Sequence, residues 1–155
     1  MLPSPAEDAD VTIDRWGSAP EATGVALQVL YVEDHPSNVR LLERLLARRG
    51  DVRLQVARTG QEGLRQAAAS RPDVVLLDLH LPDLPGEEIL QRLWQLPRLA
   101  HCTVLVLTAD ALPATAARLR AAGAADCLTK PLDVAALNAA LDRVAAAVRV
   151  REQAC

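Results

Sequence analysis

The sequence predicts an α/β fold in which helices cover both faces of a five-stranded parallel sheet. Short apolar runs rich in Val and Leu alternate five times with longer segments of helical periodicity. Two of the runs, residues 73–79 and 102–109, are almost continuously apolar. Strands buried on both faces of a parallel sheet have this composition. Because each parallel pair needs a crossover connection, the alternation predicts one α/β domain.

Two strands and two helices are expected in the first half of the domain. Residues 27–34 (LQVLYVED) form a β-rich run that ends in acidic residues, and residues 52–57 (VRLQVA) alternate as a strand does. Between them, residues 36–50 carry apolar side chains every three or four positions and end at Gly50, which predicts a helix. Residues 60–72 predict a second helix, which must stop at the proline that closes the segment.

The next two strand–helix pairs follow the same order. The run 73–79 (DVVLLDL) is interrupted only by Asp78, and residues 86–96 have helical periodicity. A second buried strand is expected at 102–109, and the alanine-rich segment 112–123 predicts a helix closed by its final glycine.

A brief strand at 125–129 and a long helix at 133–149 complete the pattern. Asp133 is a suitable N-cap for this helix. The apolar residues at helical spacing are Val134, Leu137, Leu141, Val144 and Val148. We therefore expect a folded domain over residues 27–149.

The predicted domain is flanked by two segments without such patterns. Residues 1–26 are acidic and rich in Pro, Ala and Ser, which predicts a flexible N-terminal tail or an interdomain linker. Residues 150–155 are expected to form a C-terminal tail.

Composition excludes several classes of function. The formal net charge of -3 gives no basic surface for direct binding of nucleic acid. No apolar run approaches the roughly 20 residues that span a bilayer, so we expect no membrane insertion. The N-terminal segment lacks a signal-peptide core, which favours the cytoplasm. The three cysteines are odd in number and lack metal-ligand spacing, so we expect free thiols.

Polar residues stand where four of the five predicted strands end. Ligands of open α/β sheets bind at the carboxyl ends of the strands. The residues at these ends are Glu33, Asp34, Asp78, Thr108 and Lys130. Together they predict a pocket with three carboxylates, a hydroxyl group and an ammonium group.

This set of groups suits phosphoryl chemistry supported by a divalent ion. Three neighbouring carboxylates repel one another unless a cation intervenes, and hard oxygen ligands at an open site favour Mg²⁺. A carboxylate in line with a phosphoryl donor can act as a nucleophile and form an acyl phosphate. Lys130 is the only lysine beside 16 arginines. Its compact, mobile ammonium can follow a phosphoryl group, whereas the planar fork of arginine cannot.

The segments VLYVEDHPSN, DVVLLDLHLPDLPGEEIL, VLVLTADA and AGAADCLTKPLD resemble the signature blocks of the receiver domain of two-component response regulators. The resemblance covers about residues 28 to 147, in the family's order. It implies a doubly wound, flavodoxin-like sheet with strand order 2-1-3-4-5.

The resemblance also implies a role for each site residue. Asp78 would be the phosphoacceptor, and Thr108 and Lys130 would bind the phosphoryl oxygens. Mg²⁺ (or Mn²⁺) would be held by Glu33, Asp34, Asp78 and the backbone carbonyl of His80. A cis peptide bond is expected between Lys130 and Pro131.

The partners implied by the resemblance are a histidine kinase or a histidine phosphotransfer domain. The chain would catalyse its own phosphorylation and dephosphorylation, and the face of helix 4, strand 5 and helix 5 could support a homodimer. One departure from the family is Cys127, which stands three residues before the lysine, where an aromatic switch residue is usual. The segments VEDHPSN and LTADALPATAARLRAAGAADCLTKPLD are most similar to receivers of hybrid histidine kinases. Our leading prediction is therefore the C-terminal receiver of a hybrid kinase, and a free-standing single-domain regulator is the alternative.

Other functions fit the sequence less well. A Mg²⁺-dependent aspartyl-phosphate phosphatase would need a second catalytic Asp two residues after Asp78, where the chain has His80. A flavodoxin-like FMN protein would need a phosphate loop rich in hydroxyl groups and glycine in place of EDHPSN. A receiver that serves only as a scaffold would not need the complete set of site residues. His35 is predicted to be a loop residue at a helix cap, and His80 and Asp110 are predicted either to rim the pocket or to be exposed loop residues.

Overall fold

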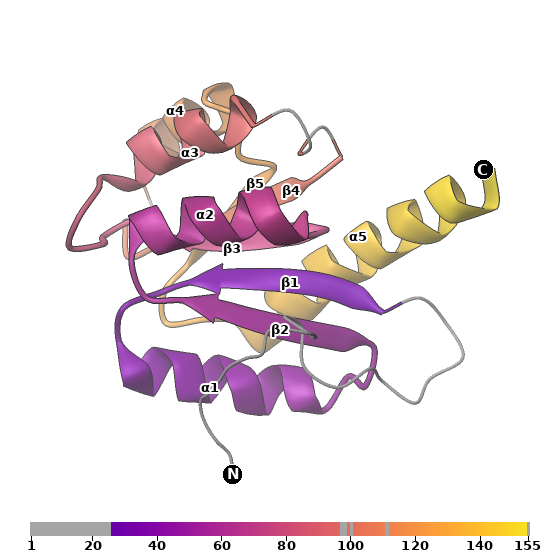
Figure 1. Cartoon of the computed structure of the whole chain (residues 1–155). Helices are drawn as coiled ribbons and strands as arrows, with labels where there is room; N and C mark the ends of the chain where they lie inside the picture. The colour runs from indigo at the N-terminus through magenta and orange to yellow at the C-terminus, as the bar shows by residue number, and fades with distance from the viewer. Residues whose placement is uncertain (1–25, 97–98, 100, 111, 155) are drawn as a thin grey trace, which may run out of the picture.

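The computed structural model describes residues 26–96, 99, 101–110 and 112–154. Five parallel strands form one sheet in the order β2-β1-β3-β4-β5, and helices lie on both of its faces (Figure 1). The predicted fold class and strand order are confirmed. The predicted N-terminal tail lies outside the described residues, apart from Ala26.

The strands and helices alternate along the chain as predicted. The strands are β1 (Leu27–Val32), β2 (Val52–Ala57), β3 (Val74–Asp78), β4 (Thr103–Thr108) and β5 (Asp126–Thr129). The helices are α1 (Pro36–Ala47), α2 (Gly60–Ser70), α3 (Gly86–Trp94), α4 (Pro113–Ala121) and α5 (Val134–Ala154). The first helix ends before Gly50, which has a φ of +78° and belongs to the turn that leads into β2. Glycine adopts this left-handed conformation without the steric cost that a side chain brings.

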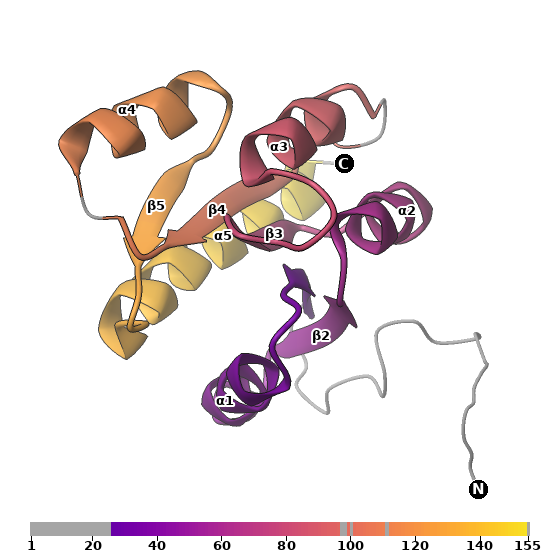
Figure 2. The ribbon, with the colours of Figure 1, turned by 90° about the vertical axis from the view of Figure 1, so that its left-hand side faces the viewer.

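The sheet separates two hydrophobic cores. Helices α1 and α5 pack on one face, and α2, α3 and α4 pack on the other (Figures 1 and 2). Side chains such as Leu42 and Leu141 fill the first core, whereas Leu90 and Leu119 fill the second. Every residue of β3 is buried, as predicted for a central strand covered on both faces. The sheet thereby fixes β3, with Asp78 as its last residue, between β1 and β4.

Helix α5 is longer than the sequence predicted. It continues to Ala154, five residues beyond the helix end expected at residue 149. The residues after 149 include neither proline nor glycine, and therefore nothing in them stops the helix. The extension is also anchored, because a terminal nitrogen of Arg151 lies 3.7 Å from Asp73 Oδ1. Asp73 in turn accepts a hydrogen bond from the backbone N–H of Gln28 in β1 (2.9 Å).

The loop between β3 and α3 is tied to the start of α2. Asp83 accepts hydrogen bonds from the backbone N–H groups of Gly60 (2.8 Å) and Gln61 (2.9 Å). Within α2, Thr59 caps the same end by accepting from the N–H of Glu62 (3.0 Å). Burial favours a higher pKa for Asp83. The hydrogen bonds from the N–H groups of Gln61 and Gly60 outweigh burial and lower the pKa below its ordinary value. These bonds fix the loop that follows Asp78.

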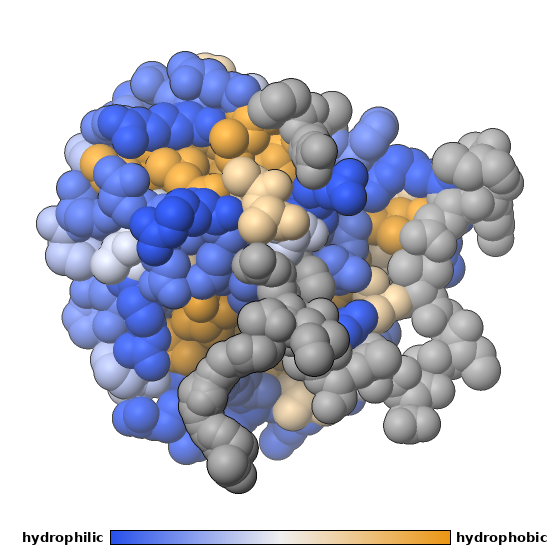
Figure 3. Space-filling model, in the orientation of Figure 1, coloured by the Kyte–Doolittle hydropathy of each residue, from blue (hydrophilic) through white to orange (hydrophobic). Residues whose placement is uncertain are grey.

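The surface is mainly hydrophilic on the face that Figure 3 shows, and hydrophobic atoms gather there in a few separate patches. In the described part of the chain, no helix combines the length and the apolar character needed to cross a membrane. Cys102 and Cys127 are free thiols, as predicted.

Candidate functional site

The polar residues predicted at the strand ends converge at one edge of the sheet. Glu33 and Asp34 follow β1 directly, and Asp78 is the last residue of the adjacent strand β3. Thr108 ends β4, and Lys130 follows the last residue of β5. The backbone N–H of Lys130 donates to the carbonyl of Thr108 (2.8 Å), which aligns the last two strand ends. The prediction that residues distant in sequence would meet at this edge is confirmed.

Lys130 connects two of the carboxylates. Its Nζ lies 3.2 Å from Asp78 Oδ1 and 3.4 Å from Glu33 Oε1. Glu33 is completely buried, and only 2% of Asp78 is exposed. Two buried carboxylates in one site are costly without a compensating charge. The ammonium of Lys130 supplies one positive charge for both. The peptide bond between Lys130 and Pro131 is cis, as expected.

Glu33 is held in its ionised form by its neighbours. The Tyr31 hydroxyl donates to Oε1 (3.0 Å), and the backbone N–H of His35 donates to Oε2 (3.3 Å). Burial by itself would raise the pKa of Glu33, but the Lys130 ammonium and these hydrogen bonds lower it below the ordinary value. Burial, followed by the charge of Glu33, raises the pKa of the Tyr31 hydroxyl, so Tyr31 remains a donor at neutral pH.

The pKa of Asp78 is shifted in the opposite direction to that of Glu33. Burial raises the pKa of Asp78 above its ordinary value, and the negative charge of Glu33 adds to this effect. The backbone N–H of His80 (3.2 Å from Oδ1) and the Lys130 ammonium oppose the increase without overcoming it. The charge of Asp78 is therefore poorly compensated by the protein groups around it. A divalent cation would supply the missing positive charge.

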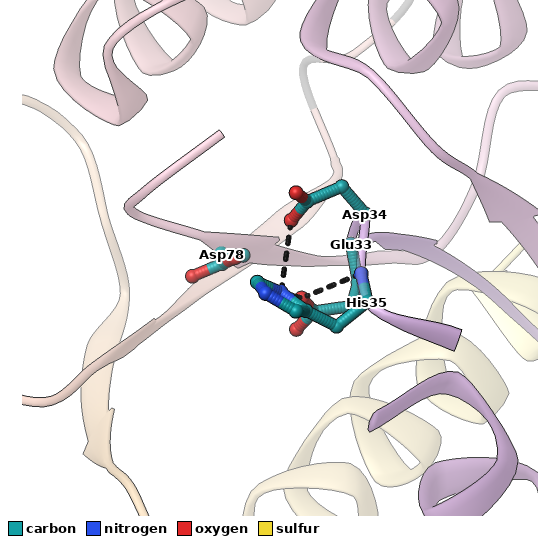
Figure 4. Close-up of side chains that lie close together, drawn as sticks. All are labelled: Glu33, Asp34, His35 and Asp78. Carbon is teal, nitrogen blue, oxygen red and sulfur yellow. Dashed lines mark hydrogen bonds and ion pairs between the residues drawn. The ribbon is translucent and has the colours of Figure 1, made fainter. Parts of the chain in front are cut away.

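The residues at this edge fit such a cation. One possible ligand atom from each of Glu33, Asp34, His35 and Asp78 lies within 4.8 Å of the others (Figure 4). Asp34 Oδ1 is a buried oxygen that accepts no hydrogen bond from any residue in the described ranges. Carboxylate oxygens without strong protein partners are suitable ligands for Mg²⁺ or Mn²⁺. The contact that the structure shows for His80 is the hydrogen bond from its backbone N–H to Asp78 Oδ1. Metal ligation by the His80 carbonyl stays a prediction.

Thr108 is positioned to donate a hydrogen bond. Its side chain is almost fully buried, with 1% of the residue exposed. Its Oγ1 accepts from the backbone N–H of Asp110 (3.0 Å), which leaves the hydroxyl proton available for another oxygen. The carboxylate of Asp110 itself accepts from Leu112 N–H (2.9 Å) and from the Thr115 hydroxyl (2.6 Å). Asp110 thus orders the start of α4.

A hollow of about 630 Å³ opens beside the acidic residues. Asp34, His80 and the loop as far as Gly86 line one part of it, and Glu87 of α3 and Arg118 of α4 line another. Nε of Arg118 lies 2.8 Å from Glu87 Oε2 and links the two helices across the rim. The prediction that His80 borders the pocket is confirmed.

Cys127 stands on β5 in register with Val106 of β4. It is partly buried and packs against the core that α2, α3 and α4 cover. Because of this packing, Cys127 is a small core-facing residue at the position where an aromatic was expected from the family, and burial raises the pKa of its thiol.

Two residues of the site were missed from the sequence. Tyr31 precedes Glu33 by two positions in an extended segment, and the period of two along a strand could have placed both side chains on one face. His35 was correctly predicted as a cap residue, and it is the N-cap of α1. However, its Nδ1 also lies 3.3 Å from Glu33 Oε2 and 3.2 Å from Asp34 Oδ1.

Comparison with known proteins agrees with this architecture. Residues 29–142 match the family model of the response regulator receiver domain. The chain is 34% identical over 134 residues to the virulence sensor protein BvgS of Bordetella bronchiseptica, covering 83% of this chain but only 11% of BvgS. It is 33% identical over 106 residues to the polar-differentiation response regulator DivK of Brucella anthropi, covering 68% of this chain and 85% of DivK. The chain therefore spans a small part of one relative and most of the other.

Solved structures of response regulator receivers have the same fold. The receiver domain of the sensor histidine kinase PA1611 of Pseudomonas aeruginosa PAO1, solved with a magnesium ion coordinated in its active site cleft, is 30% identical with a TM-score of 0.71. That match covers 79% of this chain and 99% of the other. The chemotaxis protein CheY4 of Vibrio cholerae is 28% identical with a TM-score of 0.71, over 77% of this chain and 99% of CheY4. From its fold, the residues at its strand ends and the match over residues 29–142, the chain belongs to the response regulator receiver domain family.

Proposed function

We propose that this receiver accepts a phosphoryl group on Asp78 from a phosphohistidine of a histidine kinase or a histidine phosphotransfer domain. The observation that carries the proposal is the contact between Lys130 and the buried carboxylates of Asp78 and Glu33, at 3.2 and 3.4 Å. This contact places a nucleophile of poorly compensated charge beside a mobile ammonium. Glu33, Asp34, Asp78 and the carbonyl of His80 would hold Mg²⁺ (or Mn²⁺).

The proposed transfer needs little chemistry from the protein beyond positioning and charge. An oxygen of Asp78 forms a bond to phosphorus, the P–N bond of the phosphohistidine breaks, and its electron pair stays on the imidazole of the donor. The divalent ion, when bound, neutralises charge on the phosphoryl oxygens. Lys130 Nζ moves from Asp78 to a phosphoryl oxygen, because conversion of Asp78 to an acyl phosphate removes one of the two carboxylate charges that hold it. The Thr108 hydroxyl donates to another phosphoryl oxygen.

Tyr31 supports the proposed movement of Lys130 from Asp78 to the phosphoryl group. The hydroxyl of Tyr31 and the ammonium of Lys130 both contact Oε1 of Glu33. When Lys130 turns toward the phosphoryl group, the hydroxyl of Tyr31 still donates to the buried carboxylate. Glu33 is therefore not left without a hydrogen bond, which would cost about 1–3 kcal/mol.

The receiver is proposed to be the C-terminal part of a hybrid histidine kinase. The match to BvgS covers 83% of this chain, which is more than the family model covers, and the signal transduction histidine-protein kinase BarA of Escherichia coli K12 matches over 70%. The match to DivK, over 85% of that protein, supports the free-standing alternative. Reading the gene upstream of the first codon decides between them: a kinase in the same frame supports the hybrid, and a stop codon before any kinase contradicts it. Phosphotransfer in the cytoplasm is part of the same proposal.

Incubation with acetyl phosphate and Mg²⁺ tests the proposed reaction without the cognate kinase. Intact-mass spectrometry should show the addition of one phosphoryl group to the wild type and no addition to Asp78→Asn. Asp83→Asn is the matched control, because it makes the same change at an aspartate in the loop that follows Asp78 and should still be phosphorylated. Phosphorylation of Asp78→Asn, or a wild type that stays unmodified with Mg²⁺, contradicts the proposal.

A further inference from the structure

The imidazole of His35 lies within the acidic cluster, although the proposed transfer does not use it. Its Nδ1 lies 3.2 Å from Asp34 Oδ1 and 3.3 Å from Glu33 Oε2. Figure 4 shows the ring between these two carboxylates, on the side of the site where Asp78 stands. Within this cluster of four, His35 provides the single nitrogen donor.

Hydrogen bonding does not explain the whole arrangement. The ring nitrogen makes a hydrogen-bond contact with Glu33 Oε2 (3.3 Å). Asp34 Oδ1 lies equally near, yet it is buried and accepts no hydrogen bond from the described residues. Ligands at right angles around an ion with bonds of about 2.1 Å lie about 3.0 Å from each other. The separations around Nδ1 are therefore close to those of neighbouring ligands of one ion.

The position of His35 allows it to reach such an ion. Its backbone is extended (φ -90°, ψ 117°) at the N-cap of α1, and Pro36 follows as the first helical residue. These features fix the backbone beside Asp34. The side chain is 63% exposed, so its ring can turn toward an ion without disturbing the core.

We propose that His35 is a nitrogen ligand of the divalent ion and that this receiver consequently prefers a first-row transition metal ion to Mg²⁺. The inference rests on the proposed function, because it assumes that the ion binds between Asp34 and Asp78. Mg²⁺ takes oxygen ligands and gives up its waters reluctantly. Imidazole nitrogen favours transition metals instead, and the affinity of such a site rises from Mn²⁺ through Co²⁺ to Ni²⁺.

Calorimetric titration with Mg²⁺, Mn²⁺ and Ni²⁺ tests the preference directly. At about pH 7.5, the wild type should bind the three ions with increasing affinity. His35→Asn should weaken Ni²⁺ binding about 100-fold, Mn²⁺ binding about 10-fold and Mg²⁺ binding less than about 3-fold. His101→Asn is the matched control, since His101 is exposed and precedes β4 at the opposite edge of the sheet. It should change none of the affinities.

Pulsed electron paramagnetic resonance of the Mn²⁺-loaded protein identifies the ligand. A nitrogen coupling should be present in the wild type and in His101→Asn, and absent in His35→Asn. A coupling that survives in His35→Asn, or an equal loss of affinity for all three ions, overturns the inference. A rise in affinity on removing the ring also overturns it, because the imidazole would then block the ion.

The proposed function is tested separately by phosphorylation of the wild type with Mg²⁺ alone, which needs only the oxygen ligands. If that phosphorylation occurs and His35→Asn leaves the three metal affinities unchanged, the inference about His35 fails while the proposed function stands. If the wild type is never phosphorylated but His35→Asn removes the nitrogen coupling, the proposed function fails while His35 is still a ligand.

Discussion

Lys130 Nζ lies 3.2 Å from Asp78 Oδ1, although 52 residues separate the two in the chain. The same ammonium lies 3.4 Å from Glu33 Oε1 on the other side. The sheet creates this arrangement, because β1, β3 and β5 end at one edge. The single lysine of the chain is thus the protein cation that compensates two buried carboxylates in the described structure.

Replacement of Lys130 by Met should destabilise the protein in the absence of divalent ions. The substitution leaves Glu33 and Asp78 buried without their cation. We expect a loss of about 2 kcal/mol in the free energy of unfolding. This loss is smaller than for a fully buried ion pair, because 29% of the lysine side chain is exposed. Urea unfolding at neutral pH measures the loss. Lys130→Arg keeps the charge and should lose less, yet its phosphorylation-dependent response should be impaired. Equal stability of Lys130→Met and wild type would contradict this account.

Asp78→Asn should stabilise the metal-free protein by about 1 kcal/mol at neutral pH, because it removes a poorly compensated buried charge. The folded-state pKa of Asp78 is raised. The contribution of Asp78 to stability is therefore fully present below its unfolded-state pKa and is lost as the pH rises through the folded-state pKa. Unfolding curves collected from acidic to neutral pH should show that the difference in the free energy of unfolding between the variant and the wild type increases with pH, in favour of the variant. An advantage that instead grows toward acidic pH would exclude the raised pKa.

Tyr31→Phe should destabilise the protein by about 1–2 kcal/mol at neutral pH, because a buried, charged carboxylate loses a hydrogen bond. The folded-state pKa of Glu33 is lowered, in part by this hydroxyl. The stability that Glu33 contributes is present above its unfolded-state pKa and is lost as the pH falls through the folded-state pKa. The difference between variant and wild type should thus shrink at acidic pH, as measured by denaturant unfolding. A difference that stays constant with pH would assign the loss to packing instead.

Asp83→Ala should cost about 1 kcal/mol of stability, as expected for the loss of a helix cap. Asp83→Asn should cost less, because the amide oxygen can still accept one of the two bonds from Gly60 and Gln61. Because the folded-state pKa of Asp83 is lowered, its contribution should disappear as the pH falls through that pKa. Thermal unfolding of both variants at neutral and acidic pH measures these effects. If alanine and asparagine gave the same stability, the side-chain bonds would not act as a cap.

The sequence predicted most of the fold because each element leaves a local signal. The apolar run that ends in Asp78 identified β3, and the alternation of strands and helices predicted a parallel sheet. The convergence of Glu33, Asp78 and Lys130 followed from the rule that parallel strands end at one edge, which needs no knowledge of side-chain packing.

The features that escaped prediction depend on contacts that leave no local pattern. Asp83 caps a helix that begins 23 residues earlier in the chain, and only the folded structure brings the two together. The ring of His35 turns back onto the acids that precede it, whereas the sequence indicates only a cap position. Helix α5 continues past residue 149 to Ala154, where Arg151 contacts Asp73, a residue 78 positions earlier in the chain.

Chemical trapping of the acyl phosphate tests the central claim most directly. The protein is treated with acetyl phosphate and Mg²⁺, reduced with borohydride, which converts an aspartyl phosphate to homoserine, and digested for tandem mass spectrometry. The account predicts homoserine at position 78, only when a divalent ion is present, and unmodified Asp34 and Asp83 in the same sample. Homoserine at another aspartate with position 78 intact, or trapping that is as efficient in the presence of a chelator, would contradict it.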